Sequence, residues 1–136
     1  EGGHCMSRAR IAAFWMLSCT WGIIMTMIGA IGAAVFLIMG HRPARVGYSY
    51  MFVIGQGWGA VSIGPFLWMS EGMAKQTEMR LHEAGHSIQN CLWGVLFPFI
   101  VIIPSLISAA VSSYAEHHSR WFERQATELG YKYCDF

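Results

Sequence analysis

The chain has 136 residues, of which 54% are apolar and 12% charged, and its formal net charge is +1. This length suits one domain, and the charged share is about half that of an ordinary soluble domain. The near-neutral charge argues against nucleic acid as a partner, and the apolar excess favours a lipid bilayer. We therefore expect a mainly α membrane protein with a single domain, 1–136.

The first methionine is Met6, which we interpret as the natural start. Four cysteines are present, and none belongs to a C-x-x-C pair. Cys19 and Cys91 lie inside apolar runs and are expected to be packing residues. A disulfide between Cys5 and Cys134 is the remaining pairing, and we expect it not to form.

The first long apolar run, 11–39, contains no charged residue. About 20 apolar residues cross the hydrocarbon core, so this run predicts an N-terminal transmembrane helix with some tilt. It is too long for a secretory signal and lacks a small-residue cleavage site, so we expect it to be retained. Small residues on the helix would let a second helix or a second copy of the chain approach closely. These residues are Gly22, Thr26, Gly29, Ala30 and Ala33.

Residues 40–47 contain Pro43 and two glycines and are predicted to form a loop. The next segment, 48–69, is rich in aromatic and β-branched residues, and the tripeptide Gly-Gln-Gly at 55–57 separates two strand-like runs. These features favour a short β-hairpin that turns at 55–57. Hydropathy alone would make the same segment a broken membrane helix, which is the alternative.

The mid-chain segment 74–91 is predicted to be a helix that begins among charged residues. The apolar segment 92–112 follows and is interrupted by Pro98 and Pro104. It could span the bilayer once, or form a re-entrant segment whose irregular backbone is covered by protein. A single crossing would place the flanking helices on opposite sides of the membrane. The alternatives are a re-entrant segment with pieces 92–103 and 105–112, or a helix 74–91 that is itself embedded at membrane depth. The re-entrant form is favoured because Lys75, Arg80 and Glu83 on that helix prefer an interface.

The last segment, 113–131, has the pattern of an amphipathic helix. Gly130 is a typical stop signal near its end.

The helix predicted at 74–91 contains the pattern H-E-x-x-H, formed by His82, Glu83 and His86. A spacing of four residues puts both imidazoles on one helix face, where they can bind one metal ion. Glu83 can then act as general base toward a water at the metal without being a ligand. Short patterns also match by chance, and the alternative is two surface histidines on a helix at the membrane interface.

A catalytic zinc ion has three protein ligands and one open position, so a third ligand is needed. The C-terminal helix offers Glu123, which follows two aromatic residues and precedes small residues that suit close helix packing. We choose Glu123; His117 or His118 would instead make a three-histidine site. Arg120 and Thr127 would share the helix face of Glu123 and could contact the ligands.

These motifs resemble gluzincin zinc metallopeptidases, in which H-E-x-x-H lies on one helix and a glutamate ligand on a later one. The membrane prenyl-protein proteases and their bacterial heat-shock relatives follow that glutamate with x-x-A-D, whereas this chain has Thr127 at the aspartate position. A closer similarity is to small bacterial membrane proteins with HExGH and WFExxAT motifs, over roughly 20–131. The resemblance implies a general base at Glu83 and three ligands of Zn²⁺, which are His82, His86 and Glu123.

The resemblance also implies an integral location in a bacterial plasma membrane. It supplies no established substrate, and a peptide or protein is the candidate. Peptidases of this type commonly place an edge strand beside the site, and residues 58–66 within the segment 48–69 would supply it. The alternative is that this strand simply packs against the helix. The predicted function is thus a membrane-bound zinc metallohydrolase, most directly a peptidase, with Tyr114 or Arg120 as candidate donors to the reacting carbonyl oxygen. The alternative is a non-catalytic membrane subunit or scaffold with a structural metal or a degenerate site, which a fourth ligand such as His118 would favour.

Overall fold

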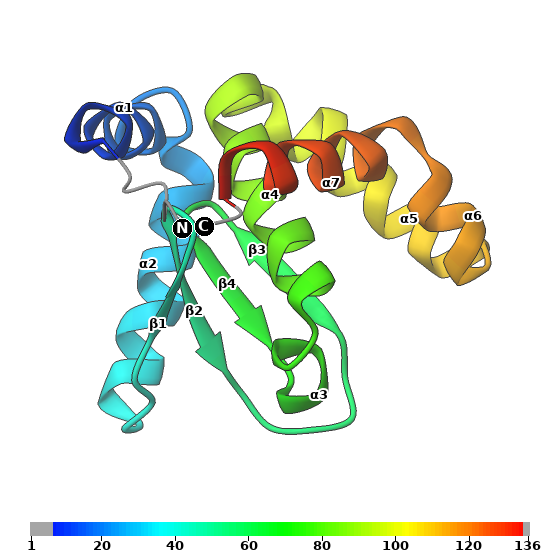
Figure 1. Ribbon diagram of the computed structural model, residues 1–136, viewed down its shortest axis with the longest axis horizontal. Helices are drawn as coiled ribbons and strands as arrows, with labels where there is room; N and C mark the ends of the chain where they lie inside the picture. Colours follow the sequence, from blue (N-terminus) through cyan, green and yellow to red (C-terminus); the bar gives the residue numbers. More distant parts are fainter. Residues whose placement is uncertain (1–6, 135–136) are drawn as a thin grey trace, which may run out of the picture.

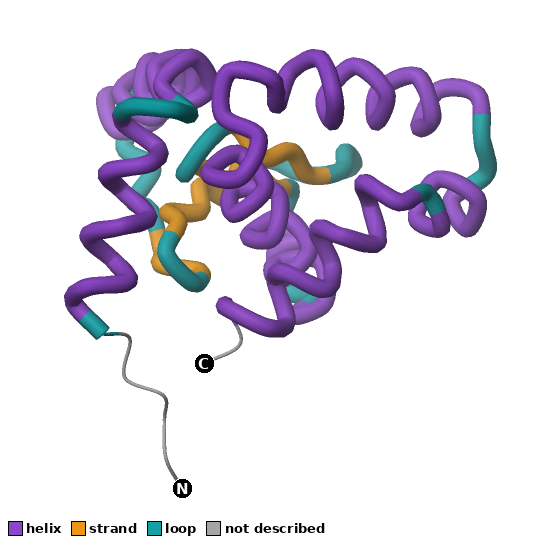
Figure 2. The backbone as a smooth tube through the Cα atoms, turned by 90° about the horizontal axis from the view of Figure 1, so that it is seen from above, coloured by secondary structure: helices purple, strands orange, loops and turns teal. Residues whose placement is uncertain are grey.

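The chain forms a small mixed sheet with helices on both faces, over the residues described in this computed structural model, 7–134 (Figures 1 and 2). The strands are β1 (Ala44–Val46), β2 (Ser49–Val53), β3 (Ala60–Ile63) and β4 (Phe66–Met69). The helices are α1 (Arg8–Cys19), α2 (Ile23–Ile38), α3 (Glu71–Ala74), α4 (Thr77–Trp93), α5 (Ile103–Val111), α6 (Tyr114–Ser119) and α7 (Trp121–Cys134). Two short helical turns, η1 (Gly94–Leu96) and η2 (Pro98–Ile102), connect α4 to α5.

The apolar run 11–39 is not the single helix that was predicted, because α1 and α2 meet at a bend of 96°. The backbone N–H of Gly22 donates to the carbonyl of Leu17 at 2.8 Å, which takes it out of the regular helical ladder. The carbonyl of Ser18 instead accepts the hydroxyl of Thr26 at 2.6 Å. These local bonds satisfy the polar groups at the break and stabilise the corner.

The small residues of this run serve contacts within the chain. A Cβ at Gly29 would overlap the carbonyl of Ile63, and one at Gly32 would overlap the indole of Trp68. At Gly29 and Gly32 the close approach is made by α2 to the β3–β4 hairpin of the same chain, whereas Ala30 is exposed.

The sheet has the order β1-β2-β4-β3, with β2 and β4 parallel and the other neighbours antiparallel. Strands within 48–69 were predicted, but the predicted turn at 55–57 is wrong. The tight turn is at Gly64, whose φ of 62° suits the first central position of a two-residue hairpin loop. Residues 54–59 instead form the connection from β2 to β3, which is the edge strand on the far side of β4. The strand β1 lies within the segment 40–47 that was predicted to be a loop.

The side chains of β4 alternate between the two helical layers. Leu67 and Met69 are fully buried and belong to a core cluster with Leu81 and Ala84 of α4. Trp68 points the other way and lies against Gly32 of α2. The sheet is thus held between α4 on one face and α2 on the other, as the alternation of strand side chains requires.

The helix predicted at 74–91 is α4, preceded by the separate turn α3. Gly94, with φ of 55°, ends α4, and the chain then bends by 114° at Phe97. The bend precedes Pro98, and Pro104 lies inside the second arm, so the predicted division at 104 is misplaced. Pro104 has no backbone N–H and cannot donate a helical hydrogen bond. The backbone N–H of the preceding residue, Ile103, donates to the carbonyl of Pro98, five residues earlier, as in a π-helical turn.

The predicted helix 113–131 is divided into α6 and α7 at Arg120, whose backbone is extended. Ser113 begins α6 with a capping box, accepting from the N–H of Glu116 while the Glu116 carboxylate accepts from the N–H of Ser113. Gly130 does not stop α7, which continues to Cys134. Figure 1 shows the chain running out along α5 to α6 and returning with α7 across α4.

Among the described residues, no single helix is both long enough and apolar enough to cross a bilayer, although two bent helix pairs meet the length and composition together. The pairs are α1 with α2, and α4 and η1 with η2 and α5. The outer faces of α2 and α5 expose many large apolar side chains, with Ile38 87% and Val111 75% exposed. The cysteine pairing considered above involves Cys5, which lies outside the described residues.

Candidate metal centre

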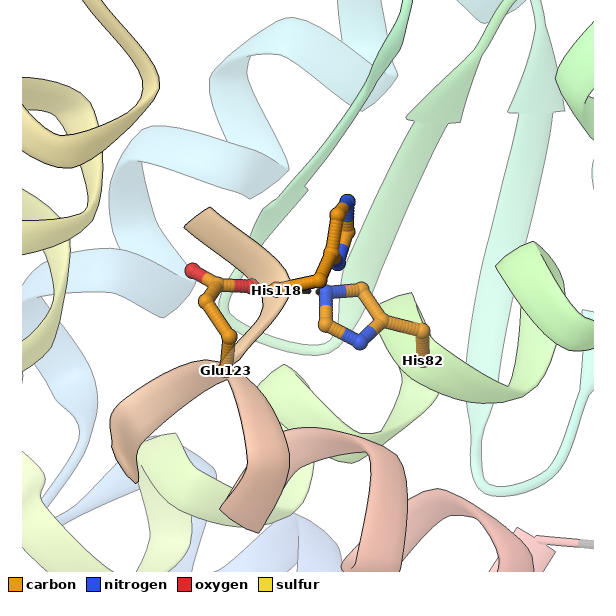
Figure 3. A group of neighbouring side chains, drawn as sticks. All are labelled: His82, His118 and Glu123. Carbon is orange, nitrogen blue, oxygen red and sulfur yellow. Dashed lines mark ion pairs between the residues drawn. The ribbon is translucent and has the colours of Figure 1, made fainter. Parts of the chain in front are cut away.

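Helices α4 and α7 bring the predicted ligand side chains together. His82 Nε2 lies 2.8 Å from Glu123 Oε2, and His86 Nε2 lies 3.3 Å from the same oxygen. Figure 3 shows His82 and Glu123 pointing toward each other, with His118 beside them. All three predicted ligands are buried, with Glu123 only 1% exposed.

Two glycines let α4 and α7 approach closely enough for this meeting. A Cβ at Gly85 would overlap the carbonyl of Ala126, and a Cβ at Gly130 would overlap the carbonyl of Leu81. Gly85 lies inside the H-E-x-x-H motif, between Glu83 and His86. Its missing side chain therefore sets the distance from the histidines to α7.

The hydroxyl of Thr127 fixes the orientation of His82. Thr127 Oγ1 donates to the carbonyl of Glu123 at 3.2 Å, so it accepts from His82 Nδ1, which lies 2.8 Å away. This assigns the N–H of a neutral His82 to Nδ1 and leaves a lone pair on Nε2, facing Glu123. Threonine thus contacts the imidazole from the position at which the families named above have an aspartate, where a carboxylate would usually orient the ligand.

Gln89 fixes His86 in the same way. Its amide nitrogen donates to the carbonyl of Phe122 at 2.7 Å and to Gln125 Oε1 at 2.9 Å, which directs its oxygen toward His86. That oxygen lies 2.7 Å from His86 Nδ1 and accepts its N–H. Both histidines therefore present Nε2 to Glu123 with Nδ1 protonated, the arrangement in which metal-binding imidazoles are found.

The second oxygen of Glu123 is held separately from the first. The hydroxyl of Ser105 donates to Oε1, and His117 Nε2 lies 3.5 Å from the same atom. His117 is itself placed by Ser108, whose Oγ lies 3.1 Å from Nδ1. These contacts leave Oε2 as the carboxylate oxygen directed at His82 and His86.

The electrostatics of the cluster require a positive charge between its members. If both imidazoles are neutral, two nitrogen lone pairs face one carboxylate oxygen at hydrogen-bonding distance. Burial alone would lower the pKa of His86, but the bond to Glu123 and the charges of Glu83 and Glu123 outweigh it and raise the pKa. Burial would raise the pKa of Glu123, yet the bonds from His82 and His86 hold it well below its usual range. Protons or a metal cation can supply the missing charge.

The donor set fits Zn²⁺. Two imidazole nitrogens and one carboxylate oxygen are the ligands of many catalytic zinc sites. Mg²⁺ and Ca²⁺ prefer sites made only of oxygen ligands, so the two imidazoles argue against them. Zinc–ligand bonds of about 2.0–2.1 Å in a tetrahedron place ligand atoms roughly 3.3 Å apart. Two of the three ligand separations, the Nε2–Oε2 distances of 2.8 and 3.3 Å, are near that value.

Glu83 lies beside this cluster with its carboxylate free. It is buried, and its ligand atom falls within 4.8 Å of those of His82 and His86. Over residues 7–134 it makes no hydrogen bond or ion pair. A buried carboxylate this close to the site, with no hydrogen bond of its own, is available to accept a proton there.

His118 is in a different position from the three ligand candidates. It forms a group with His82 and Glu123 whose ligand atoms lie within 4.8 Å of one another. Its ring packs against Tyr114, with centroids 4.2 Å apart, and it makes no hydrogen bond to any residue that the structure describes. Burial and the neighbouring His82 lower the pKa of His118.

The remaining predicted residues divide between the site and the surface. Thr127 contacts His82, whereas Arg120 is exposed and bonds Ser112, away from the site. Sequence reasoning missed Gln89 and Ser105. Gln89 had a readable signal, because it is three residues after His86 on the same helix, but Ser105 reaches Glu123 only through the bend at Phe97.

A scan against protein-family models, a search of curated proteins and a search of solved structures each found no match to the chain.

Proposed function

We propose that this chain is a membrane-bound zinc metallohydrolase, most directly a peptidase. The observation that carries the proposal is the convergence of His82 Nε2 and His86 Nε2 on one oxygen of Glu123, with both Nδ1 atoms engaged by acceptors. A carboxylate that only stabilised the fold would not need two imidazoles held in matching tautomers. The resemblance to gluzincin peptidases supports the same ligand set.

Glu83 is the general base in this proposal. When bound, zinc would lower the pKa of a water molecule and polarise the substrate carbonyl. Glu83 accepts a proton from the attacking water and delivers it to the leaving nitrogen as the C–N bond breaks, which yields a carboxylate and an amine. The two glutamates have different roles because their contacts differ. Both carboxylate oxygens of Glu123 are held by His82, His86 and Ser105, which suits a ligand. Glu83 has no such hydrogen bonds and can accept a proton.

The β3 strand offers a place for extended substrate. It is one of the two edge strands of the sheet, and Ala60–Ile63 line a cleft together with His82 and Glu83. The backbone N–H of Ser70 donates to the carbonyl of Gly59 at 3.1 Å, so Gly59 bonds toward the β4 side. In an antiparallel pair the hydrogen-bonded residues alternate along the strand. The backbone N–H and C=O groups of Ala60 and Ser62 therefore face away from β4. A peptide backbone could pair with these groups beside the metal.

Exposed apolar helices support the membrane part of the proposal. Large side chains such as Ile31 on α2 and Ile107 on α5 are 67% and 58% exposed, and burying the exposed part of each one is worth about 1–2 kcal/mol. The exposed apolar faces of α2 and α5 belong to separate helices, and a lipid bilayer can cover both of them at once. In this arrangement α1, α2 and α5 contact lipid, and α4 with the metal centre lies at the membrane surface.

The second candidate is a structural metal in a non-catalytic membrane subunit. It is favoured by one observation, the proximity of His118 to His82 and Glu123. A fourth protein ligand would close the site and leave no position for water. His118→Ala separates the two functions, because a closed site would lose zinc affinity about as much as it does with His86→Ala, whereas an open site would keep it.

Hydrolysis by the zinc-loaded protein tests the proposal. Glu83→Gln should retain zinc and reduce kcat by at least about a hundredfold, since general-base catalysis contributes about 10²–10⁴-fold. Glu78→Gln is the matched control, because Glu78 is an exposed glutamate on the same helix. Equal peptide hydrolysis by wild type and Glu83→Gln would contradict the assigned role.

A further inference from the structure

A cleft of 440 Å³ adjoins the candidate metal centre. Apart from the glutamates and histidines of the centre, its walls contain no charged side chain among the described residues. The other side chains are mainly apolar and come from α2, β3, α3, α4, η2 and α5. Those that carry the argument are Met25, Ile63, Met79, Val101, Leu106 and Ala109.

This lining restricts what the cleft can hold. A charged side chain that entered it would lose water and find no opposite charge beyond the metal centre itself, which is costly. Cleavage at a chain end requires a partner for the terminal amine or carboxylate. Over residues 7–134 the lining offers no Lys, Arg or Asp for that purpose, and its two glutamates belong to the metal centre. The chemistry therefore favours an internal segment with uncharged, large apolar side chains.

The apolar lining continues onto the outside of the molecule. Leu106 lines the cleft and is also 64% exposed on α5, and Ala109, one turn further, is likewise both lining and exposed. On the outer side of the same arm, Phe99, Ile103 and Ile107 are exposed. A substrate can thus pass from the exposed apolar surface of α5 into the cleft without leaving apolar surroundings.

We propose that the cleft binds an internal, extended segment with large apolar side chains on both sides of the cleaved bond, and that a bilayer-anchored protein supplies it. This inference rests on the proposed peptidase function and deepens it by naming the substrate class. The free edge of β3 holds the backbone of the segment, and the apolar walls hold its side chains.

The test uses the full chain, zinc-loaded, in phosphatidylcholine vesicles, and internally quenched peptides. One peptide carries Leu, Ile and Phe around its centre, and matched peptides carry Ser, Asp or Lys there. Each sequence is offered free in solution and joined to a 20-residue apolar membrane anchor. We expect kcat/KM for the apolar sequence to exceed that for the charged ones at least tenfold, and the anchored form to be cleaved faster than the free form.

A substitution in the wall tests the cleft itself. Ala109→Glu places a carboxylate on an exposed lining position, so it should lower cleavage of the apolar peptide and raise cleavage of the Lys peptide. Ala110→Glu is the matched control, because Ala110 is exposed on the same helix and does not line the cleft. We expect the control to keep the wild-type preference.

The outcomes separate this inference from the function on which it rests. Equal cleavage of apolar and charged peptides overturns the substrate class while leaving a peptidase, and equal cleavage of free and anchored forms overturns the bilayer as source. An unchanged preference in Ala109→Glu overturns the assignment of the cleft. Zinc-loaded protein that cleaves none of the peptides overturns the peptidase function and this inference together.

Discussion

At the scale of single residues, the site depends on side chains that orient the histidines as much as on the ligands. Thr127 and Gln89 accept the Nδ1 protons of His82 and His86, and each is held by a second hydrogen bond of its own. Such contacts raise the basicity of a ligand imidazole and fix the direction of its lone pair. Their loss should therefore weaken metal binding without removing a ligand.

Thr127→Val should lower zinc affinity about 10–100-fold, the usual effect of removing an orienting partner. Valine keeps the shape of threonine and removes the hydroxyl that accepts from His82. Thr127→Ser restores that hydroxyl and should bind zinc nearly as wild type does. Competition with a chromophoric chelator measures both variants, and equal affinity of the valine and serine variants would show that the hydroxyl does not orient His82.

The ion pair of His86 and Glu123 predicts a pH dependence for the zinc-free protein. Folding raises the pKa of His86 above 6.5, so its stabilisation is complete below about pH 6.5 and is lost as pH rises through the folded pKa. Folding lowers the pKa of Glu123 from 4.5, so its stabilisation is present above about pH 4.5 and is lost on acidification. We expect the highest stability between these values.

Thermal denaturation in the presence of a chelator measures this dependence. The Tm of the zinc-free wild type should fall from pH 6.5 to 9, and Glu123→Gln should show a weaker dependence because the acceptor charge is gone. A Tm that rises over the same interval in the wild type would mean that His86 is not stabilised as a cation by Glu123.

At the scale of elements, the contact of α4 with α7 decides whether the ligands meet. Gly85→Ala adds a Cβ that overlaps the carbonyl of Ala126, so the helices must separate. We expect a loss of about 1–3 kcal/mol in the free energy of unfolding, the usual cost of overpacking, together with weaker zinc binding.

Gly72→Ala is the matched control for this substitution. Gly72 lies in the short helix α3, and a Cβ there meets no atom within 4 Å. Alanine should be neutral or stabilising at that position because it favours helix. Urea denaturation and zinc titration of both variants measure the difference, and a Gly85→Ala protein as stable as Gly72→Ala would refute the close contact.

The elements also show which features the sequence could predict. The H-E-x-x-H spacing and the aromatic and small residues around Glu123 are local patterns, and the side chains they indicated, His82, His86 and Glu123, lie close together in the structure. The turn of the hairpin was misplaced because Gly55 and Gly57 are as typical of a turn as Gly64. The order β1-β2-β4-β3 depends on pairing between distant segments, which a local pattern does not encode.

The bends were the least predictable elements. The corner between α1 and α2 depends on the hydroxyl of Thr26 reaching Ser18, and Trp21 reinforces it by donating its indole N–H to Leu92 at 3.2 Å. Hydropathy records the apolar character of these residues and not the bonds that interrupt the helix. The prolines correctly signalled a broken segment after α4, although the bend itself lies at Phe97.

At the scale of the whole molecule, the exposed faces of α2 and α5 predict association with lipid. Ile31→Glu and Ile107→Glu each place a charge at an exposed position, so folding should be kept while vesicle binding falls. Flotation with phosphatidylcholine vesicles measures binding, and circular dichroism checks folding. Arg124→Glu, at an exposed position on α7, is the control and should float as wild type does. Flotation of both isoleucine variants at the wild-type level would contradict lipid contact at these faces.

The zinc content of the purified protein tests the central claim most directly. Elemental analysis after dialysis should find about one zinc per chain in wild type and in Glu83→Gln, and close to none in His82→Ala, His86→Ala and Glu123→Ala. Wild-type protein that is folded and retains no zinc when supplied with it would contradict the account, as would Glu123→Ala protein with full zinc content.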